Sequence, residues 1–255
     1  MAMGKSNYVI GLRSVEQLIN NQNIKIKKVF AEYHSKNKRL NSIINHANTF
    51  DIPIHSANRA RLDQICGESS HQGIIAEISR NLISNESELR SMIERRLSNP
   101  KSEPFLLLML ERIKDPHNLG ACIRTAEAAG VDALIISQRD SASLTPAAIK
   151  VASGAAEQIP LIRVKHLGKV LLWLGEYGVM RIGTSDKANE SIFEVGCKES
   201  CILVMGQEHS GISKMIKDRC DKLAHIPMQG SVSSLNVSVA AGICLFEIVR
   251  SRISM

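Results

Sequence analysis

The chain has 255 residues, of which 44% are apolar, a normal share for a globular protein that excludes a wholly disordered chain. Its 32 Lys and Arg residues outnumber its 25 Asp and Glu residues, so the formal net charge is +7. The 5 Phe, 3 Tyr and 1 Trp residues are too few for a platform that stacks many nucleic-acid bases on rings. This length allows one large domain or two modest ones.

Features of secretion, membrane insertion and metal binding are missing from the sequence. The start, Met1 to Asn7, has no apolar stretch of a signal peptide, and the longest uncharged stretch, 226–246, contains Pro227 and four serines. Cys197 and Cys201 are four residues apart, but no second Cys or His pair at metal-binding spacing accompanies them. We therefore expect a cytoplasmic protein with no membrane anchor and no metal.

Basic residues are concentrated in the first third of the chain. Residues 1–80 hold 11 Lys and Arg against 6 Asp and Glu, and so carry +5 of the net charge. The clusters Lys25–Lys28 and Lys36–Arg39 supply most of it. The charge alone fits either a solvated face or a module that contacts phosphates.

Residues 1–80 alternate between strand and helix patterns, which predicts a small α/β domain. The predicted strands are 29–33, 52–54 and 73–78, and the predicted helices are 39–50 and 59–66, the second ended by Gly67.

Residues 81–104 are polar and end in Asn99-Pro100-Lys101-Ser102-Glu103-Pro104, which predicts a linker. One short helix is expected within it, at 86–97.

Residues 105–255 alternate between strands and helices again, which predicts a doubly wound α/β domain with a parallel sheet. The first strand, 105–110, is apolar throughout, as suits a strand buried on both faces. The other predicted strands are 133–137, 179–184, 201–205 and 222–226, and the helices are 119–129, 167–177, 213–220 and 237–250. Cys122 and Cys244 fit the helical cores, and the last helix is apolar almost all round, so it should be buried against the sheet or a partner subunit.

The common nucleotide and hydrolase motifs do not occur in this domain. There is no G-x-G-x-x-G, G-x-S-x-G or H-E-x-x-H sequence. Gly206 and Gly211 have P-loop spacing, but Ile212 stands where the phosphate-binding Lys should be. A Walker ATPase, an ordinary α/β hydrolase and a nicotinamide oxidoreductase are therefore disfavoured.

The loop 114–120 follows the first buried strand of this domain and opens a helix. Asn118 is a suitable N-cap, and Gly130 should end the helix. Arg124 lies off the apolar stripe near the N-terminal end, where a cation opposes the helix dipole. Arg124 is therefore either a solvated side chain or an anion clamp.

Two further loops follow predicted strands. Gly206–Gly211 permits a tight turn at a strand's carboxyl end, where Glu208 would project and His209 could act as a base or stay idle. The loop 226–236 is rich in small polar residues, and Asn236 is the expected N-cap of the last helix. All three loops could share one edge of the sheet.

Together these segments resemble the SpoU/TrmH family of RNA ribose 2′-O-methyltransferases, in the SPOUT superfamily. The resemblance rests on D-P-H-N-L-G-A-C-I-R-T-A-E-A-A-G, V-M-G-Q-E-H-S-G and I-P-M-Q-G-S-V-S-S-L-N-V-S-V-A-A-G, which look like motifs 1, 2 and 3. It extends to Tyr8–Gly11, Ala57–Arg59 and His71–Ala76, and so covers nearly the whole chain apart from the linker. This wider match resembles the members that methylate a guanosine of 23S ribosomal RNA.

The resemblance implies a deep trefoil knot in the C-terminal domain, an N-terminal RNA-binding domain and a homodimer. It also implies S-adenosylmethionine (SAM) as cofactor. The cofactor-binding positions that it implies are Met205, Gly206, Gly211, Ile226, Met228 and Leu235. The catalytic positions that it implies are Asn118, Arg124, Glu208, Ser234 and Asn236. One departure is the segment Glu111-Arg112-Ile113-Lys114, where the family usually has small or acidic residues, and this could alter RNA contacts.

The expected reaction transfers a methyl group to a ribose 2′-hydroxyl. Arginine essentially never deprotonates in proteins, so we expect Arg124 to grip a phosphate and stabilise the developing alkoxide. Glu208 would orient Arg124 or accept the proton, while Asn118 and Ser234 would fix the ribose. Two alternatives stay open: the same methylation on transfer RNA, and a non-catalytic RNA-binding protein of ribosome assembly on this fold.

Overall fold

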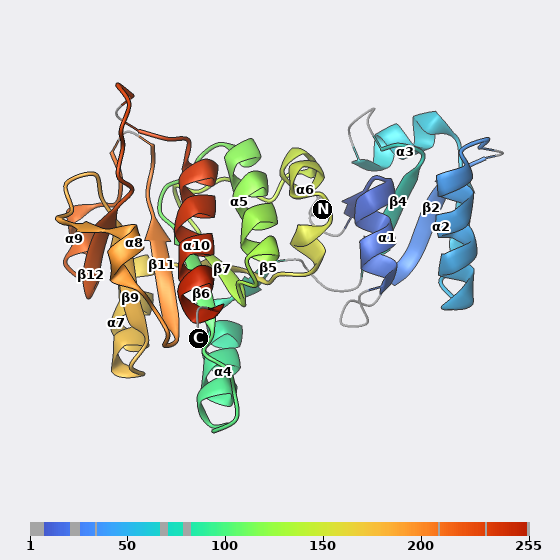
Figure 1. Ribbon diagram of the computed structural model, residues 1–255. Coiled ribbons are helices and arrows are strands. Elements are labelled where there is room, and N and C mark those ends of the chain that lie inside the picture. Colours follow the sequence, from blue (N-terminus) through green and yellow to red (C-terminus); the bar gives the residue numbers. More distant parts are fainter. Residues whose placement is uncertain are drawn as a thin grey trace. The chain divides into compact units, whose positions relative to one another are not determined.

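The computed structural model describes residues 8–20, 26–33, 35–66, 71–78, 83–208, 210–232 and 234–253. Gly67, His209 and the start of the chain, on which predictions were made, lie outside the described residues. Contacts divide the chain into two compact units. One comprises Met1–Leu82 and Ser143–Gln158, and the other Ile83–Ala142 and Ile159–Met255 (Figure 1).

The first unit is built on a four-stranded sheet of order β1-β4-β2-β3, in which β4 is antiparallel to both β1 and β2 and β2 is parallel to β3. Its strands are β1 (Tyr8–Ile10), β2 (Ile26–Glu32), β3 (Ile54–Ala57) and β4 (Ile74–Ile78), and its helices are α1 (Leu12–Asn20), α2 (Lys38–Thr49), α3 (Arg59–Cys66), α6 (Pro146–Ala152) and the 3-10 turn η2 (Ala155–Glu157). The predicted small α/β fold is confirmed.

One strand of this unit begins later than predicted. The sequence places it at 52–54, whereas β3 begins at Ile54. Pro53 has no backbone N–H and takes part only through its carbonyl, which accepts a hydrogen bond from Val29 N at 2.8 Å. The strand β1 and the helix α1 were not predicted.

The second unit is an eight-stranded, all-parallel sheet of order β10-β12-β9-β11-β6-β7-β8-β5. Its strands are β5 (Ile83–Asn85), β6 (Leu106–Leu110), β7 (Ala133–Ser137), β8 (Leu161–Val164), β9 (Met180–Thr184), β10 (Glu190–Ser191), β11 (Cys201–Met205) and β12 (Lys222–His225). Its helices are α4 (Glu86–Leu97), α5 (Pro116–Ala128), α7 (Leu167–Glu176), α8 (Ile192–Val195), α9 (Lys214–Lys217) and α10 (Val237–Ile253).

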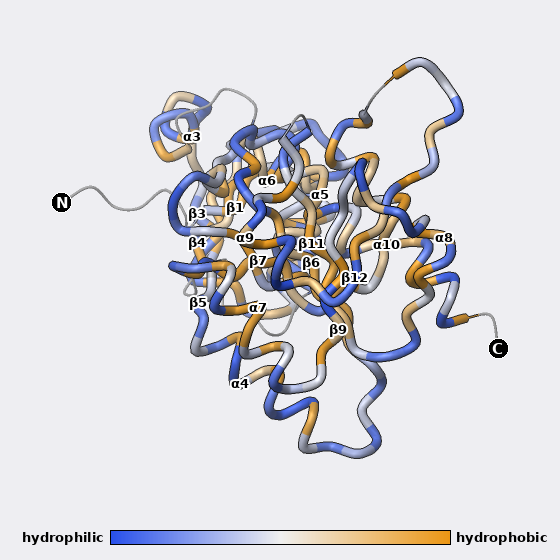
Figure 2. The backbone as a smooth tube through the Cα atoms, turned by 90° about the vertical axis from the view of Figure 1, so that its left-hand side faces the viewer, coloured by the Kyte–Doolittle hydropathy of each residue, from blue (hydrophilic) through white to orange (hydrophobic). Residues whose placement is uncertain are grey.

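Helices cover both faces of this sheet, as the doubly wound pattern predicts. Leu107 and Met109 point to the face that holds α4 and α7, while α5 and α10 lie side by side on the other face (Figure 1). The central strands form the hydrophobic interior of the unit (Figure 2). Cys122 and Cys244 are fully buried there, and burial raises the pKa of each thiol to about 12, which confirms their role as core residues.

Two helix boundaries differ from the sequence prediction. Asn118 is not the N-cap of α5: the helix begins three residues earlier with Pro116 in its first turn, and Asp115 Oδ1 accepts a hydrogen bond from His117 N at 2.9 Å. The helix predicted at 213–220 is only the four-residue α9, because the chain turns at Asp218 to enter β12.

The segment between the predicted domains takes part in the larger sheet. The predicted helix at 86–97 is confirmed as α4, and Asn85 caps it by accepting a hydrogen bond from Glu88 N at 3.1 Å. Just before it, β5 pairs with β8 at one end of the sheet. Among the described residues no helix is both long and apolar enough to cross a membrane.

Candidate functional site

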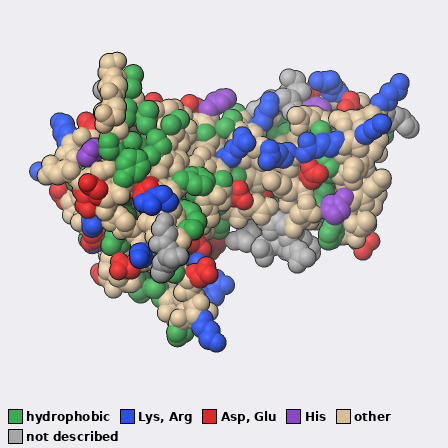
Figure 3. Space-filling model, viewed as in Figure 1, with side chains coloured by type: hydrophobic (Ala, Val, Ile, Leu, Met, Phe, Trp, Pro, Cys, Tyr) green, Lys and Arg blue, Asp and Glu red, His purple; other side chains and the backbone are tan. Residues whose placement is uncertain are grey.

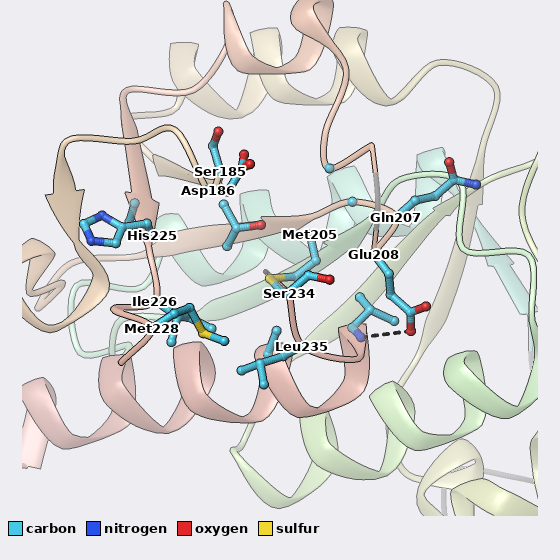
Figure 4. Close-up of a pocket in the computed structure, with 16 residues that line it drawn as sticks. Ser185, Asp186, Met205, Gln207, Glu208, His225, Ile226, Met228, Ser234 and Leu235 are labelled. Carbon is cyan, nitrogen blue, oxygen red and sulfur yellow. Dashed lines mark hydrogen bonds between the residues drawn. The ribbon is translucent and has the colours of Figure 1, made fainter. Parts of the chain in front are cut away.

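A cavity of about 240 Å³ opens at the carboxyl ends of β9, β11 and β12 (Figure 4). Ligands of open α/β sheets bind at this edge, because loops rather than strands surround it. All six predicted cofactor-binding residues line the cavity: Met205, Gly206, Gly211, Ile226, Met228 and Leu235. The two loops that the sequence analysis singled out after β11 and β12 therefore meet.

Gly206 and Gly211 give this cavity its tight wall. A Cβ atom on Gly206 would lie 2.1 Å from the backbone carbon of Gly211, so no side chain fits there. Gly211 has a φ of +59°, and its N–H donates to the carbonyl of Gln207 at 2.8 Å. The chain thus folds back directly over the end of β11.

The cavity wall combines apolar and polar groups. Met205, Ile226 and Leu235 provide apolar surface, and Ser185 and Asp186 enter from the loop after β9, opposite Ser234 (Figure 4). Ser185 and Asp186 were not predicted as site residues from the sequence. Their position just beyond the predicted strand 179–184 was a usable signal, but only the strand order shows that this strand lies beside β11.

Beside the cavity, three predicted site residues form one hydrogen-bonded cluster: Asn118 in the first turn of α5, Glu208 in the loop after β11 and Asn236 at the start of α10. Glu208 Oε1 accepts from Asn236 Nδ2 at 2.6 Å and from Asn118 Nδ2 at 3.3 Å. Asn236 Nδ2 also donates to Asn118 Oδ1 at 2.9 Å. Because Asp115 rather than Asn118 caps α5, the side chain of Asn118 is available for this cluster.

The start of α10 fixes the orientation of this cluster. Asn236 Oδ1 accepts from Ser238 N at 2.9 Å and from Ser238 Oγ at 2.6 Å, so Asn236 caps the helix as predicted and its amide nitrogen must face Glu208. Val237 N donates to Glu208 Oε1 at 3.3 Å, the bond drawn in Figure 4. A carboxylate at a helix N-terminus is also favoured by the helix dipole.

These contacts leave the second oxygen of Glu208 available. All three hydrogen bonds to the carboxylate end on Oε1, and Oε2 receives none from the described residues. Glu208 lines the cavity and is exposed. It can therefore accept a hydrogen bond or a proton from a ligand hydroxyl.

The two remaining predicted catalytic residues behave differently from each other. Ser234 lines the cavity and is exposed. Arg124 is exposed on α5 and does not line this cavity or the second cavity described below. It makes no hydrogen bond or ion pair with a described residue. A single chain thus does not bring Arg124 to the Glu208 cluster.

A second cavity of about 280 Å³ adjoins the first. Gln207, Glu208 and Val237 line both cavities, so the Glu208 cluster forms part of the wall between them. Arg112 and Lys114, from the loop after β6, line only the second cavity. The arrangement can hold one ligand on each side of a hydrogen-bonding carboxylate.

Comparison with known proteins relates both parts of the chain to RNA methylation. The SpoU rRNA Methylase family matches residues 105–246, and the family described as RNA 2′-O ribose methyltransferase substrate binding matches residues 8–82. A protein of Pasteurella multocida named 23S rRNA (guanosine-2′-O-)-methyltransferase RlmB is 42% identical over 98% of this chain and 100% of its own length. The RlmB protein of Escherichia coli K12 is 40% identical over 97% of this chain and 99% of its own length.

The fold also matches solved structures. The SpoU methyltransferase AviRb from Streptomyces viridochromogenes, in complex with AdoMet, has a TM-score of 0.79 at 24% identity over 97% of this chain and 90% of that chain. The A. aeolicus TrmH/SpoU tRNA modifying enzyme has a TM-score of 0.54 at 29% identity, over 65% of this chain and 83% of that chain. From the family match over the larger unit and relatives at about 40% identity along almost the whole chain, we conclude that the protein belongs to the SpoU rRNA methylase family.

Proposed function

We propose that this protein transfers a methyl group from SAM to the ribose 2′-hydroxyl of a guanosine in 23S ribosomal RNA. The observation that carries the proposal is the cavity at the carboxyl edge, which is lined by all six predicted cofactor residues and adjoins the Glu208 cluster. Relatives at 40% and 42% identity over nearly the full chain carry the name of this activity.

The residues of the first cavity suit SAM. Its apolar surface, from Met205, Ile226 and Leu235, suits an adenine ring, and Ser185, Asp186 and Ser234 can bind hydroxyl or ammonium groups. Gly206 keeps the backbone close enough for main-chain groups to reach the ligand. When bound, SAM supplies an activated methyl group, so the protein contributes orientation and electrostatics.

The Glu208 cluster would prepare the acceptor hydroxyl. Asn118 and Asn236 hold Glu208 Oε1, which leaves Oε2 to accept the proton of the 2′-hydroxyl. Ser234 and Asn118 would position the ribose. Positioning is a large part of such catalysis, since a fixed near-attack geometry replaces an encounter between free reactants.

A second copy of the chain would complete the site. Val239, Phe246 and Ile253 are spaced seven residues apart on α10 and are 52%, 48% and 74% exposed, an unusual position for large apolar side chains. Figure 3 shows hydrophobic side chains gathered over this helix. This stripe supports a homodimer that buries α10, and Arg124, on the neighbouring helix α5, would then lie near the interface and clamp a phosphate of the RNA.

The trefoil knot implied by the resemblance is also part of the proposal. It is supported by the strand order, in which β9 lies between β11 and β12, so that the chain passes back and forth across the sheet within 180–225. A knot would hold the loops after β11 and β12 together without ligand, which suits a preformed cofactor cavity.

The first 80 residues would bind the RNA, since they carry most of the net charge and match the substrate-binding family. Figure 3 shows several Lys and Arg side chains on the visible face of this unit. We also propose that residues 1–80 form the RNA-binding domain, 81–104 the linker and 105–255 the methyltransferase domain, and that the protein acts in the cytoplasm. Transfer RNA stays the second candidate substrate, because one structural relative is named a tRNA modifying enzyme, although it covers only 65% of this chain.

A ligand screen tests the cofactor first. At a concentration 100-fold above its Kd, SAM should stabilise the protein by about 2.7 kcal/mol in a thermal unfolding assay, whereas NAD and ATP should not. A protein stabilised by NAD or ATP and not by SAM would contradict the proposal. SAM binding without methyl transfer to any RNA would instead favour the non-catalytic alternative.

A further inference from the structure

Arg112 adopts a backbone conformation that is unusual for its type. Its φ is +59°, in the left-handed region, which costs a residue with a Cβ about 1 to 2 kcal/mol. Such strain persists only where the surrounding structure holds it, and it is concentrated at functional sites. Arg112 is the second residue after the end of β6 and lines the second cavity.

A buried carboxylate, that of Glu111, lies beside the guanidinium group of Arg112. Glu111 is buried, and its carboxylate accepts hydrogen bonds from Ser213 N at 2.6 Å and from Ser213 Oγ at 2.7 Å. Arg112 Nε lies 3.8 Å from Glu111 Oε1 and is buried with no hydrogen bond to a described residue, while the side chain as a whole stays 37% exposed. The anchored carboxylate thus keeps the cation at the cavity, and no described residue uses the donors of its guanidinium group.

Lys114 adds a second cation to the same cavity. It is exposed and has no hydrogen bond or ion pair with a described residue. The cavity also holds two carboxylates: Asp115, whose Oδ1 caps α5, and Glu208, whose Oε1 accepts three hydrogen bonds and whose Oε2 would face the acceptor. Arg112 and Lys114 are the Lys and Arg side chains among the described lining residues, so they are the charged groups of this cavity that can attract an anion.

The location of the second cavity beside Glu208 indicates which anion would bind there. Glu208 and Gln207 line both cavities, so a ribose that reaches Glu208 Oε2 from the second cavity has its adjoining phosphodiesters near the loop 112–114. Arg is suited to such a group, because its planar fork matches two phosphate oxygens, and Lys adds a point charge.

We propose that the second cavity is the entry site of the RNA strand and that Arg112 and Lys114 bind the phosphodiester next to the ribose to be methylated. This inference rests on the proposed function, whose acceptor is an RNA ribose. It assigns two positioning residues outside the three motifs.

Arg112→Gly is the most informative variant, since glycine adopts a positive φ without strain and the substitution removes the charge without disturbing the backbone. Lys114→Gln removes the second charge, and Lys198→Gln, on an exposed residue near the start of β11, is the matched control for lost charge. For each protein we would measure SAM affinity by calorimetry and the KM and kcat for unmodified 23S rRNA. A labelled single-stranded RNA of about ten nucleotides gives the salt dependence of RNA affinity.

Arg112→Gly should weaken RNA binding about tenfold, as expected for the loss of one hydrogen bond to a charged group. It should also lower the slope of log K against log salt by about 0.7, the value for one single-strand phosphate contact. SAM affinity should stay unchanged, and Arg112→Lys should restore part of the loss. If RNA binding and KM change no more than in Lys198→Gln while methyl transfer continues, the inference is overturned and the proposed function stands. If wild type methylates no RNA, the proposed function fails, and the salt slopes still decide whether Arg112 contacts phosphate.

Discussion

The two edges of the eight-stranded sheet use polar groups in opposite ways. At the carboxyl edge, Glu208 keeps one carboxylate oxygen unbonded by the described residues, and Arg112 and Lys114 keep unused donors. At the amino edge, Arg252 donates to the carbonyls of Cys197, Pro104, Phe105 and Glu199. One arginine thus satisfies four carbonyls there, whereas the other edge leaves bonding capacity for ligands.

This difference shows where stability and function reside in one sheet. A saturated network contributes to folding, because each buried carbonyl without a donor costs about 1 to 3 kcal/mol. An edge whose polar groups lack hydrogen-bond partners contributes less to the free energy of folding, but those groups can bind a ligand. Substitutions at the two edges should therefore separate activity from stability.

The largest effect is expected for Gly206→Ala at the carboxyl edge. The new methyl group would meet the backbone of Gly211, so the loop must shift and the SAM cavity should be lost. We expect no SAM binding by calorimetry and a lowered Tm. Gly230→Ala, whose Cβ would have no atom within 4 Å, is the control and should behave as wild type. Normal SAM affinity in Gly206→Ala would show that this turn does not shape the cofactor site.

Glu208→Gln should separate activity from stability most clearly. The glutamine oxygen can still accept from Asn236 and Val237, but an amide nitrogen replaces the free Oε2 and cannot take a proton. We expect kcat to fall by about 10²- to 10⁴-fold, with Tm and SAM affinity almost unchanged. Glu199→Gln, at the opposite edge, controls for the lost charge. A kcat within a few-fold of wild type would remove Glu208 as the proton acceptor.

At the amino edge the reverse is expected. Arg252→Met should lower the free energy of unfolding by about 1 to 3 kcal/mol, because four carbonyls, two of them in part-buried contacts, lose their donor, while kcat for the folded protein stays near wild type. Chemical denaturation and initial rates measure the two quantities. An unchanged stability together with a reduced kcat would contradict the comparison.

The smallest effect is a pH dependence of stability at the same edge. The hydrogen bond from Cys201 lowers the pKa of the Cys197 thiol to about 7, and the charge of Arg252 acts in the same direction. A depressed pKa adds stability above the unfolded value of about 8.5 to 9, and this is lost as the pH falls through 7. As the pH rises from 7 to 9, the stability of wild type should therefore increase relative to that of Cys197→Ser. Parallel stability curves for the two proteins would exclude this ionisation.

The sequence predicted the parts of the fold that have a strong local pattern. The strands 105–110 and 201–205 and the last helix are recognisable from their local runs of apolar residues. The short strand Leu161–Val164 was missed, because it is only four residues long, follows Pro160 and contains Arg163, and its pairing with β7 and β5 is a property of the whole sheet. Asn118 was wrongly taken as the N-cap, because Asp115 and Pro116 compete for the same helix start.

The candidate site was predicted from motif resemblance more than from physical rules. The cavity unites Met205, Gly206 and Leu235 as expected, and the cluster joins Asn118, Glu208 and Asn236. Ser185 and Asp186 were missed, because only the strand order places the end of β9 beside the end of β11. Arg124 does not line the cavity in a single chain, so its predicted role depends on the proposed dimer.

Labelled methyl transfer tests the central claim most directly. The protein would be incubated with methyl-labelled SAM and either unmodified 23S rRNA or bulk tRNA, and the modified nucleotide would be mapped. We expect a 2′-O-methyl group on a single guanosine of 23S rRNA and none on tRNA. Label on tRNA alone would keep the chemistry but contradict the assigned substrate, and the absence of label from every RNA despite SAM binding would contradict the proposed reaction.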